Sequence, residues 1–255
     1  MSSLAGHRIL VVGASSGVGR AFAERAIRDG AHVAIAARRQ ERLEEIIADA
    51  GGGIGITADV RIDGDPERLV TAAVAELGGL DLLFYAAGVA PLRHLVDTEA
   101  DDWRYALETN VIGVQRVLAT AVPVMSHGSV AAILSSETVG RPRPALGAYG
   151  ASKAAVTESL RAWRLEHPEV RFSCVALGAT QPTEFGDAFA GDVLTPVLDV
   201  WFKHGLMQQS YMETAEVAHL LADLYASALA YPGVGIEDIT LRSPTLPASG
   251  WDEMV

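Results

Sequence analysis

Residues 9–19 read Ile9-Leu10-Val11-Val12-Gly13-Ala14-Ser15-Ser16-Gly17-Val18-Gly19. The apolar run at the start predicts a buried strand, and the residues from Val18 onward predict a helix. Glycines between two such elements allow a tight turn and let a pyrophosphate approach backbone N–H groups without a Cβ in the way. The helix that follows directs its positive end at the phosphates. The segment therefore predicts a dinucleotide-binding turn. An ordinary turn is the alternative, because the spacing Gly-x-x-x-Gly-x-Gly differs from the more common Gly-x-Gly-x-x-Gly.

The rest of the chain repeats this alternation of strand and helix. Most apolar runs are continuous, which is typical of strands covered on both faces. Such alternation predicts parallel strands joined by right-handed crossovers, hence an α/β fold with one Rossmann-type doubly wound sheet of about seven strands. We expect a single domain over residues 1–255. The predicted strands are 7–12, 32–36, 54–58, 80–85, 129–135, 170–177 and 236–241, and the predicted helices are 18–29, 39–50, 66–77, 101–125, 152–167 and 214–227.

A helical insertion at residues 184–209 interrupts the alternation after the sixth strand. In open α/β sheets, ligands bind outside the carboxyl ends of the strands, so this insertion is well placed to form a substrate lid. Its apolar side chains suggest a hydrophobic substrate, although packing of the insertion against the sheet explains most of them equally well. These side chains are Phe185, Phe189, Leu194, Val197, Leu198, Trp201 and Phe202.

Composition excludes several classes of partner. The chain has 32 acidic and 20 basic residues, a formal net charge of -12, whereas nucleic acids and anionic membranes require a cationic surface. Its one cysteine, Cys174, lies in an apolar run and is predicted to be a packed core thiol. No run approaches the roughly 18 to 20 apolar residues of a membrane span, and none resembles a signal peptide. We expect a cytoplasmic protein that uses no metal and binds neither nucleic acid nor a membrane.

The end of the second predicted strand bears on the choice of dinucleotide. Folds that prefer NAD commonly place an acid about 20 residues after the glycine turn, on the ribose 2′-hydroxyl. Here Ala37 is followed by Arg38 and Arg39, with no carboxylate. We expect Arg38 to bind a 2′-phosphate by charge-assisted hydrogen bonds, with hydroxyl donors from Ser15 and Ser16. The cofactor is therefore predicted to be NADP(H). In the alternative, the two arginines only begin an exposed helix, and the cofactor is NAD(H).

A tyrosine and a lysine stand four residues apart in Tyr149-Gly150-Ala151-Ser152-Lys153. Positions i and i+4 share one helix face, so the ammonium would stabilise a phenolate and lower a tyrosine pKa that is normally about 10. Such a tyrosine can exchange a proton with an alcohol or carbonyl oxygen. Ser136 ends the fifth predicted strand shortly before this pair.

On these residues the chain resembles the short-chain dehydrogenase/reductase family, in its branch of small single-domain enzymes, over essentially its whole length. The motifs that carry the resemblance are Gly13, Gly17 and Gly19, Asp59-Val60, Asn110, Ser136, Tyr149 and Lys153. The resemblance implies hydride transfer between a nicotinamide cofactor and a small carbonyl or alcohol substrate.

The same resemblance implies residue roles. Tyr149 would be the general acid/base, and Ser136 would polarise the substrate oxygen. Lys153 would hold the nicotinamide ribose and tune Tyr149. Asn110 would kink its helix and fix a water, or simply interrupt the helix, and Ser135 is the alternative to Ser136. At the adenine, Asp59 would accept a hydrogen bond and Val60 would pack nearby.

Two stretches depart from the family pattern without removing a catalytic group. After the fourth strand, Tyr85-Ala86-Ala87-Gly88 replaces Asn-Asn-Ala-Gly, and Ala87 and Gly88 still permit close approach of the cofactor. After the sixth strand, Leu177-Gly178 replaces Pro-Gly, and either Thr180 or Thr183 would bond the nicotinamide carboxamide.

We therefore expect an active NADP(H)-dependent oxidoreductase; a non-catalytic nucleotide-sensing relative is the alternative. We also expect a homotetramer paired through helices 101–125 and 152–167.

Overall fold

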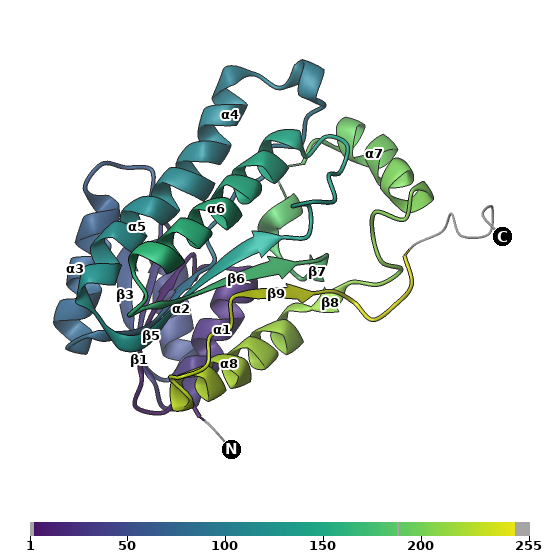
Figure 1. Ribbon diagram of the computed structural model, residues 1–255. Helices are drawn as coiled ribbons and strands as arrows, with labels where there is room; N and C mark the ends of the chain where they lie inside the picture. Colours follow the sequence, from purple (N-terminus) through teal and green to yellow (C-terminus); the bar gives the residue numbers. More distant parts are fainter. Residues whose placement is uncertain (1–2, 188, 248–255) are drawn as a thin grey trace.

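The computed structural model describes residues 3–187 and 189–247, and in this part of the chain a seven-stranded sheet forms the centre of the molecule (Figure 1). The strand order is β3-β2-β1-β4-β5-β6-β9, and every neighbouring pair is parallel. The prediction of a doubly wound α/β sheet is thereby confirmed. The strands are β1 (Arg8–Val12), β2 (His32–Ala37), β3 (Ile54–Thr57), β4 (Leu80–Tyr85), β5 (Met125–Ser136), β6 (Arg171–Leu177) and β9 (Asp238–Leu241).

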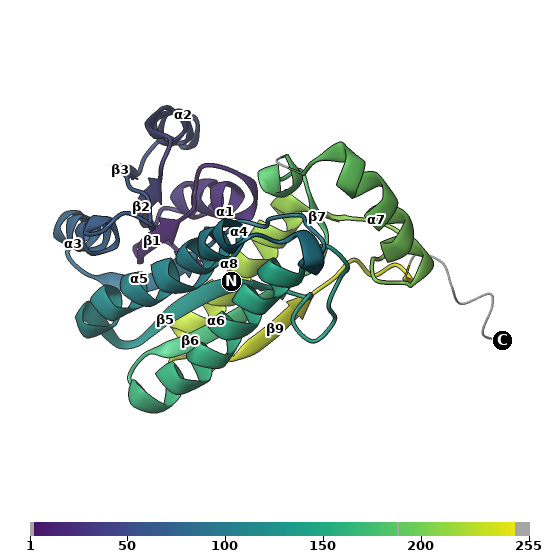
Figure 2. The same ribbon diagram turned by 90° about the horizontal axis from the view of Figure 1, so that it is seen from above.

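Helices cover both faces of the sheet, which explains why the strands are apolar on both sides. On β1, Ile9 and Val11 belong to one apolar cluster, while Leu10 and Val12 belong to the cluster on the opposite face. The first cluster includes buried residues of α1 (Gly17–Arg28), α2 (Gln40–Ala50) and α8 (Thr214–Ala230). The second includes residues of α3 (Asp65–Leu77), α5 (Gly113–Ala121) and α6 (Gly147–Glu166). Figure 2 shows these layers from above.

The strand order reverses between β1 and β4, which are neighbours at the centre of the sheet. A crevice at the carboxyl ends of the strands is expected at such a switch point. Two further elements lie beyond these ends: α7 (Gly191–Lys203), and the short parallel pair of β7 (Thr180–Gln181) and β8 (Met212–Glu213). Figure 1 shows α7 past the arrowheads of β5 and β6.

The helix predicted over 101–125 is divided in the structure. It consists of α4 (Ala100–Leu107), a π-helical turn (Glu108–Ile112), α5 and a short 3-10 turn (Val122–Val124). Met125 already belongs to β5, where it pairs with Leu80. The π turn includes Asn110, whose side chain bonds to the backbone of Val89. Because this contact joins segments distant in the chain, the helical periodicity of residues 101–125 could not predict the interruption.

Helix α6 begins at Gly147, five residues before the predicted start at Ser152. Two glycines in Gly147–Ala151 reduce local helix propensity, but tertiary packing overrides it. A Cβ at Gly147 would collide with the side chain of Leu95. Tyr149 therefore lies inside the first turn of the helix. None of the helices described is long and apolar enough to cross a membrane.

Candidate active site

The turn between β1 and α1 is closely packed against the end of β4. Gly13 and Gly17 have positive φ angles of 86° and 55°, conformations that favour glycine. A Cβ at Gly13 would collide with the backbone of Ala87, and one at Gly19 would collide with the carbonyl oxygen of Gly13. The turn thus exposes backbone rather than side chains at the amino end of α1, which suits a pyrophosphate. Val18, the first residue after Gly17, is buried in the core beneath the turn.

Arg39, rather than Arg38, reaches the glycine turn. Its Nη2 donates to Ser15 Oγ over 2.9 Å, and its guanidinium also pairs with Glu184. Arg38 is exposed, and its charge helps to lower the pKa of Asp59. The two arginines therefore face different parts of the crevice. The chain leaves regular strand geometry after Ala37, so sequence alternation could not show which of them turns toward Ser15.

Asp59 and Val60 follow β3 at the same edge of the sheet. The Asp59 carboxylate accepts hydrogen bonds from Arg61, from the backbone N–H over 3.0 Å and from Nε over 3.1 Å, and these lower the pKa of Asp59. A carboxylate has further lone pairs to accept from an adenine amino group. Val60 is buried against Gly113. The adenine contacts of both residues stay predictions.

Ser136, Tyr149 and Lys153 come together at the carboxyl end of β5, and each is less than a tenth exposed. The Ser136 hydroxyl is close enough to Tyr149 to oppose the rise in its pKa. Ser136 Oγ also accepts from the backbone N–H of Thr138 over 3.2 Å and from its hydroxyl over 3.0 Å. Sequence reasoning missed Thr138. The N–H and the hydroxyl of Thr138 occupy both lone pairs of Ser136 Oγ. The hydrogen of the serine hydroxyl can therefore be donated to another group.

Lys153 lies one helical turn after Tyr149 but does not bond to it. Its Nζ donates to the carbonyl of Leu134 over 2.9 Å and stands 6.0 Å from the centre of the Tyr149 ring. Burial lowers the pKa of Lys153 to about 8. Burial also raises the pKa of Tyr149, opposed by the Ser136 hydroxyl and the charge of Arg143. The expectation that Lys153 lowers the pKa of the tyrosine is therefore wrong for this structure, because desolvation outweighs the contributions of Ser136 and Arg143.

Asn110 connects the end of β4 to the catalytic helix. Its side-chain amide donates to the Val89 carbonyl over 2.8 Å and to Ser152 Oγ over 2.9 Å, and its Oδ1 accepts from the Val89 N–H over 2.8 Å. Ser152 Oγ in turn donates to the Tyr149 carbonyl over 2.7 Å. Gly88 lies beside this junction, since a Cβ there would be 3.2 Å from Lys153 Nζ and 3.4 Å from Asn110 Oδ1. The proposed water at Asn110 stays a prediction.

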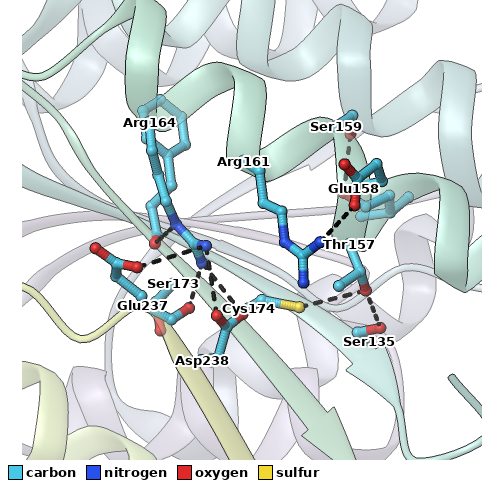
Figure 3. A network of polar contacts seen from close by, with 12 residues as sticks. Ser135, Thr157, Glu158, Ser159, Arg161, Arg164, Ser173, Cys174, Glu237 and Asp238 are labelled. Atoms are coloured by element: carbon cyan, nitrogen blue, oxygen red, sulfur yellow. Dashed lines mark hydrogen bonds and ion pairs between the residues drawn. The ribbon is translucent and has the colours of Figure 1, made fainter. Parts of the chain in front are cut away.

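Ser135 faces away from Tyr149. Its Oγ bonds to Thr157 Oγ1 over 3.0 Å, and Thr157 also contacts Cys174 Sγ at 3.6 Å (Figure 3). Cys174 is 4% exposed, as expected of a core thiol. Because successive side chains of a strand point to opposite faces, the geometry brings Ser136, and not Ser135, to the tyrosine.

Thr180 and Thr183 follow β6 on the segment that crosses the crevice. Thr180 Oγ1 donates to the Gly178 carbonyl over 3.0 Å. A Cβ at Gly17 would lie 3.4 Å from Thr183 Cγ2, so Thr183 is beside the glycine turn. Thr183 Oγ1 accepts from the Phe185 N–H over 3.4 Å. Which of the two meets a nicotinamide stays a prediction.

The apolar residues of the insertion pack mainly against the loop before α6. Val197 and Trp201 are buried with Leu92, Ala145, Leu146, Tyr149 and Met207 in a third apolar cluster, separate from the two clusters on the sheet. Phe185 is 44% exposed, and its ring centre lies 5.2 Å from that of Tyr149. An apolar surface therefore adjoins the tyrosine. Ala188, within the predicted insertion, lies outside the described residues.

A buried ion cluster next to Ser136 has no counterpart in the sequence predictions. Glu137 pairs with Arg143, and its other oxygen pairs with Arg242 Nε over 3.0 Å. Arg143 also donates to the Leu206 carbonyl over 3.0 Å and lies over the Trp201 ring. The cluster ties the end of β5 to the insertion and to the segment after β9. A Cβ at Gly178 would lie 3.3 Å from Glu137 Oε2. The absence of a side chain at Gly178 therefore leaves space for this carboxylate.

Comparisons with known proteins agree with this arrangement. The family model described as short chain dehydrogenase matches residues 7–192. Human dehydrogenase/reductase SDR family member 2, mitochondrial, is 36% identical over 197 residues, covering 74% of this chain and 70% of that protein. Glycine betaine reductase ATRR of Emericella nidulans is 39% identical over 170 residues, 64% of this chain but 13% of that much longer protein.

Among solved structures, a short chain dehydrogenase from Burkholderia cenocepacia J2315 in complex with NADP superposes with a TM-score of 0.80. Its sequence is 26% identical, and the match covers 94% of this chain and 98% of that one. The chain belongs to the short chain dehydrogenase family, whose members are oxidoreductases acting on alcohol or carbonyl groups.

Proposed function

We propose that the protein is an NADP(H)-dependent oxidoreductase that interconverts a small, largely apolar carbonyl compound and its alcohol. The observation that carries this proposal is the buried Tyr149, beside Ser136 and one helical turn from Lys153, at the carboxyl end of β5. We further propose that residues 1–255 form one domain, with 184–209 as a lid over the substrate. The apolar cluster of α7 beside Tyr149 supports the lid.

The residues present fit a dinucleotide. The close approach of Gly13 and Gly19 to neighbouring backbone leaves the turn bare of side chains, and Arg39 with Ser15 offers donors for a 2′-phosphate. A side chain at Gly88 would crowd Lys153 Nζ, so glycine at this position keeps that nitrogen accessible to hold a ribose hydroxyl. Bound NADP(H) would supply or accept the hydride. The Burkholderia relative, solved in complex with NADP, supports this choice.

The protein's own side chains would handle the proton. Ser136, whose oxygen accepts from Thr138, would donate its hydrogen to the substrate oxygen. Burial keeps Tyr149 protonated at neutral pH, so in reduction it can give its proton to the developing alkoxide. In oxidation the same oxygen accepts that proton. The fixed donors also stabilise the negative charge that develops on the substrate oxygen.

The experiment is a screen of apolar ketones and aldehydes with NADPH, followed by the loss of NADPH absorbance, together with calorimetric titration of NADPH and NADH. Arg38→Asp and Arg39→Asp each add repulsion near the phosphate. Since Arg39 bonds to Ser15, we expect its variant to shift preference toward NADH by at least about tenfold, roughly 1.4 kcal/mol. Unchanged NADPH affinity in both variants would favour NAD(H) as the cofactor.

A further inference from the structure

A carboxylate already binds the groups assigned to the 2′-phosphate. Glu184 accepts from both terminal nitrogens of Arg39, over 3.2 Å from Nη1 to Oε1 and over 2.6 Å from Nη2 to Oε2. The same Nη2 donates to Ser15 Oγ, and Ser16 is close enough to help lower the pKa of Glu184, after the larger effect of Arg39. Paired, charge-assisted hydrogen bonds of this kind are also the way an arginine holds a phosphate.

Glu184 comes from the segment between β7 and α7, beyond the carboxyl ends of the central strands. The residue before it, Thr183, lies beside Gly17 of the glycine turn. The residue after it, Phe185, packs its ring against Tyr149. Three consecutive side chains therefore contact the pyrophosphate turn, the phosphate-binding arginine and the catalytic tyrosine. The side chains of Arg39 and Glu184 are 38% and 39% exposed, so a ligand can reach the pair from solvent.

The two dinucleotides would meet this pair differently. A 2′-phosphate and the Glu184 carboxylate compete for the same guanidinium nitrogens and repel each other. A ribose with a free 2′-hydroxyl brings no competing anion. It can instead donate to a carboxylate at this point, which is the role of the acid that NAD-preferring folds carry after the second strand.

We propose that Glu184 is a cofactor-specificity residue, whose carboxylate occupies the 2′-phosphate site on Arg39, Ser15 and Ser16. NADP(H) must displace it, whereas NAD(H) binds with the ion pair intact. Glu184 thus reduces the preference for NADP(H) over NAD(H). It supplies the acid that is missing after β2 from the segment between β7 and α7. This proposal rests on the proposed function.

The test is calorimetric titration with 2′,5′-ADP and with 5′-AMP, two probes that differ only in the 2′-phosphate and involve no turnover. Glu184→Gln removes the competing charge. We expect it to bind 2′,5′-ADP at least about threefold more tightly than the parent, on the scale of an exposed ion pair, while its affinity for 5′-AMP stays the same or falls. With Arg39→Gln already present, Glu184→Gln should give no gain, because the contested cation is gone.

Glu41→Gln is the matched control. Glu41 is exposed in the first turn of α2 and acts on Arg39 through its charge, so its variant removes the same charge without freeing the arginine. An equal gain from Glu41→Gln, or no gain from Glu184→Gln, overturns the role of Glu184 while leaving the NADP(H) assignment standing. Failure of the parent to distinguish 2′,5′-ADP from 5′-AMP, with no gain in either variant, would remove the NADP(H) assignment as well.

Discussion

At the scale of single residues, Tyr149 combines a buried ring with one polar contact that matters for chemistry. We expect Tyr149→Phe to retain the fold and NADPH affinity, because the ring still fills its place beside Phe185. Turnover should fall by about 10² to 10⁴, the usual contribution of a positioned general acid. Steady-state rates on any substrate found, with NADPH affinity measured alongside, check this outcome.

Two further variants separate the proposed roles. Ser136→Ala should lower turnover with a small effect on NADPH binding, whereas Lys153→Ala should lower both. If Tyr149→Phe kept more than about a tenth of the parental rate with chemistry rate-limiting, Tyr149 could not be the acid/base, and a non-catalytic role in nucleotide sensing would gain support.

Lys153 should also leave a signature in the pH dependence of stability. Its pKa is about 8 in the folded protein against a usual 10.5, so between these values the unfolded chain holds a proton that the folded protein has lost. The free energy of unfolding contributed by this group therefore rises with pH in that window, by up to about 1.4 kcal/mol per pH unit. Urea unfolding of the parent and of Lys153→Met from pH 7 to 9.5 should show a steeper rise in the parent. Parallel profiles would contradict it.

The sequence predicted the site residues where the chemistry requires one residue type. It did not predict the direction in which the side chains point. Glycines 13, 17 and 19 follow from the backbone conformations and close contacts that the turn needs. The choice between Arg38 and Arg39 depends on how the chain leaves β2. The bonds of Thr138 to Ser136 and of Glu184 to Arg39 depend on the paths of loops. Loop paths cannot be predicted from the periodicity of the sequence.

At the scale of elements, the ion cluster at Glu137 joins three segments distant in the chain. Its side chain is 4% exposed, and that of Arg143 is 9% exposed. Removing one member leaves buried charge without compensation, so Glu137→Gln should lower the free energy of unfolding by about 3 kcal/mol. Glu158→Gln is a suitable comparison, because the Glu158–Arg161 pair on α6 is largely exposed (Figure 3), and its loss should cost less than about 1 kcal/mol. Equal midpoints of urea unfolding would disprove the difference.

Most strands were predictable as elements because burial on both faces makes them continuous apolar runs, and Leu80–Tyr85 was predicted to the residue. Helix limits were less accessible. The division of 101–125 depends on Asn110 reaching Val89, and the early start of α6 depends on Leu95 filling the space beside Gly147. Both are contacts between segments distant in the chain, so local helix propensity cannot predict them.

At the scale of the whole molecule, we propose that four copies assemble through α4, α5 and α6 and through a second face. Figure 1 shows α4 and α5 end to end, with α6 beside them on the outside of the sheet. Large apolar side chains are exposed on α4, on the π-helical turn and on α6: Leu107 is 36%, Ile112 49% and Leu165 84% exposed. A closed tetramer built as a dimer of dimers needs a second two-fold interface. Strand β9, at the end of the sheet order, and the exposed Leu220 on α8 supply candidate surface for it.

Light scattering should give four times the 26.9 kDa of one chain at micromolar concentration. Leu107→Glu with Leu165→Glu places charge in the first interface and should halve this mass, because each isologous contact contains every substitution twice. Ile62→Glu, at a residue 57% exposed outside these helices, controls for added surface charge and should leave the mass unchanged. A parental mass equal to one chain would exclude the tetramer. A mass unaffected by the paired substitutions would place the interface on another face, where the β9 edge and α8 are the next surfaces to alter.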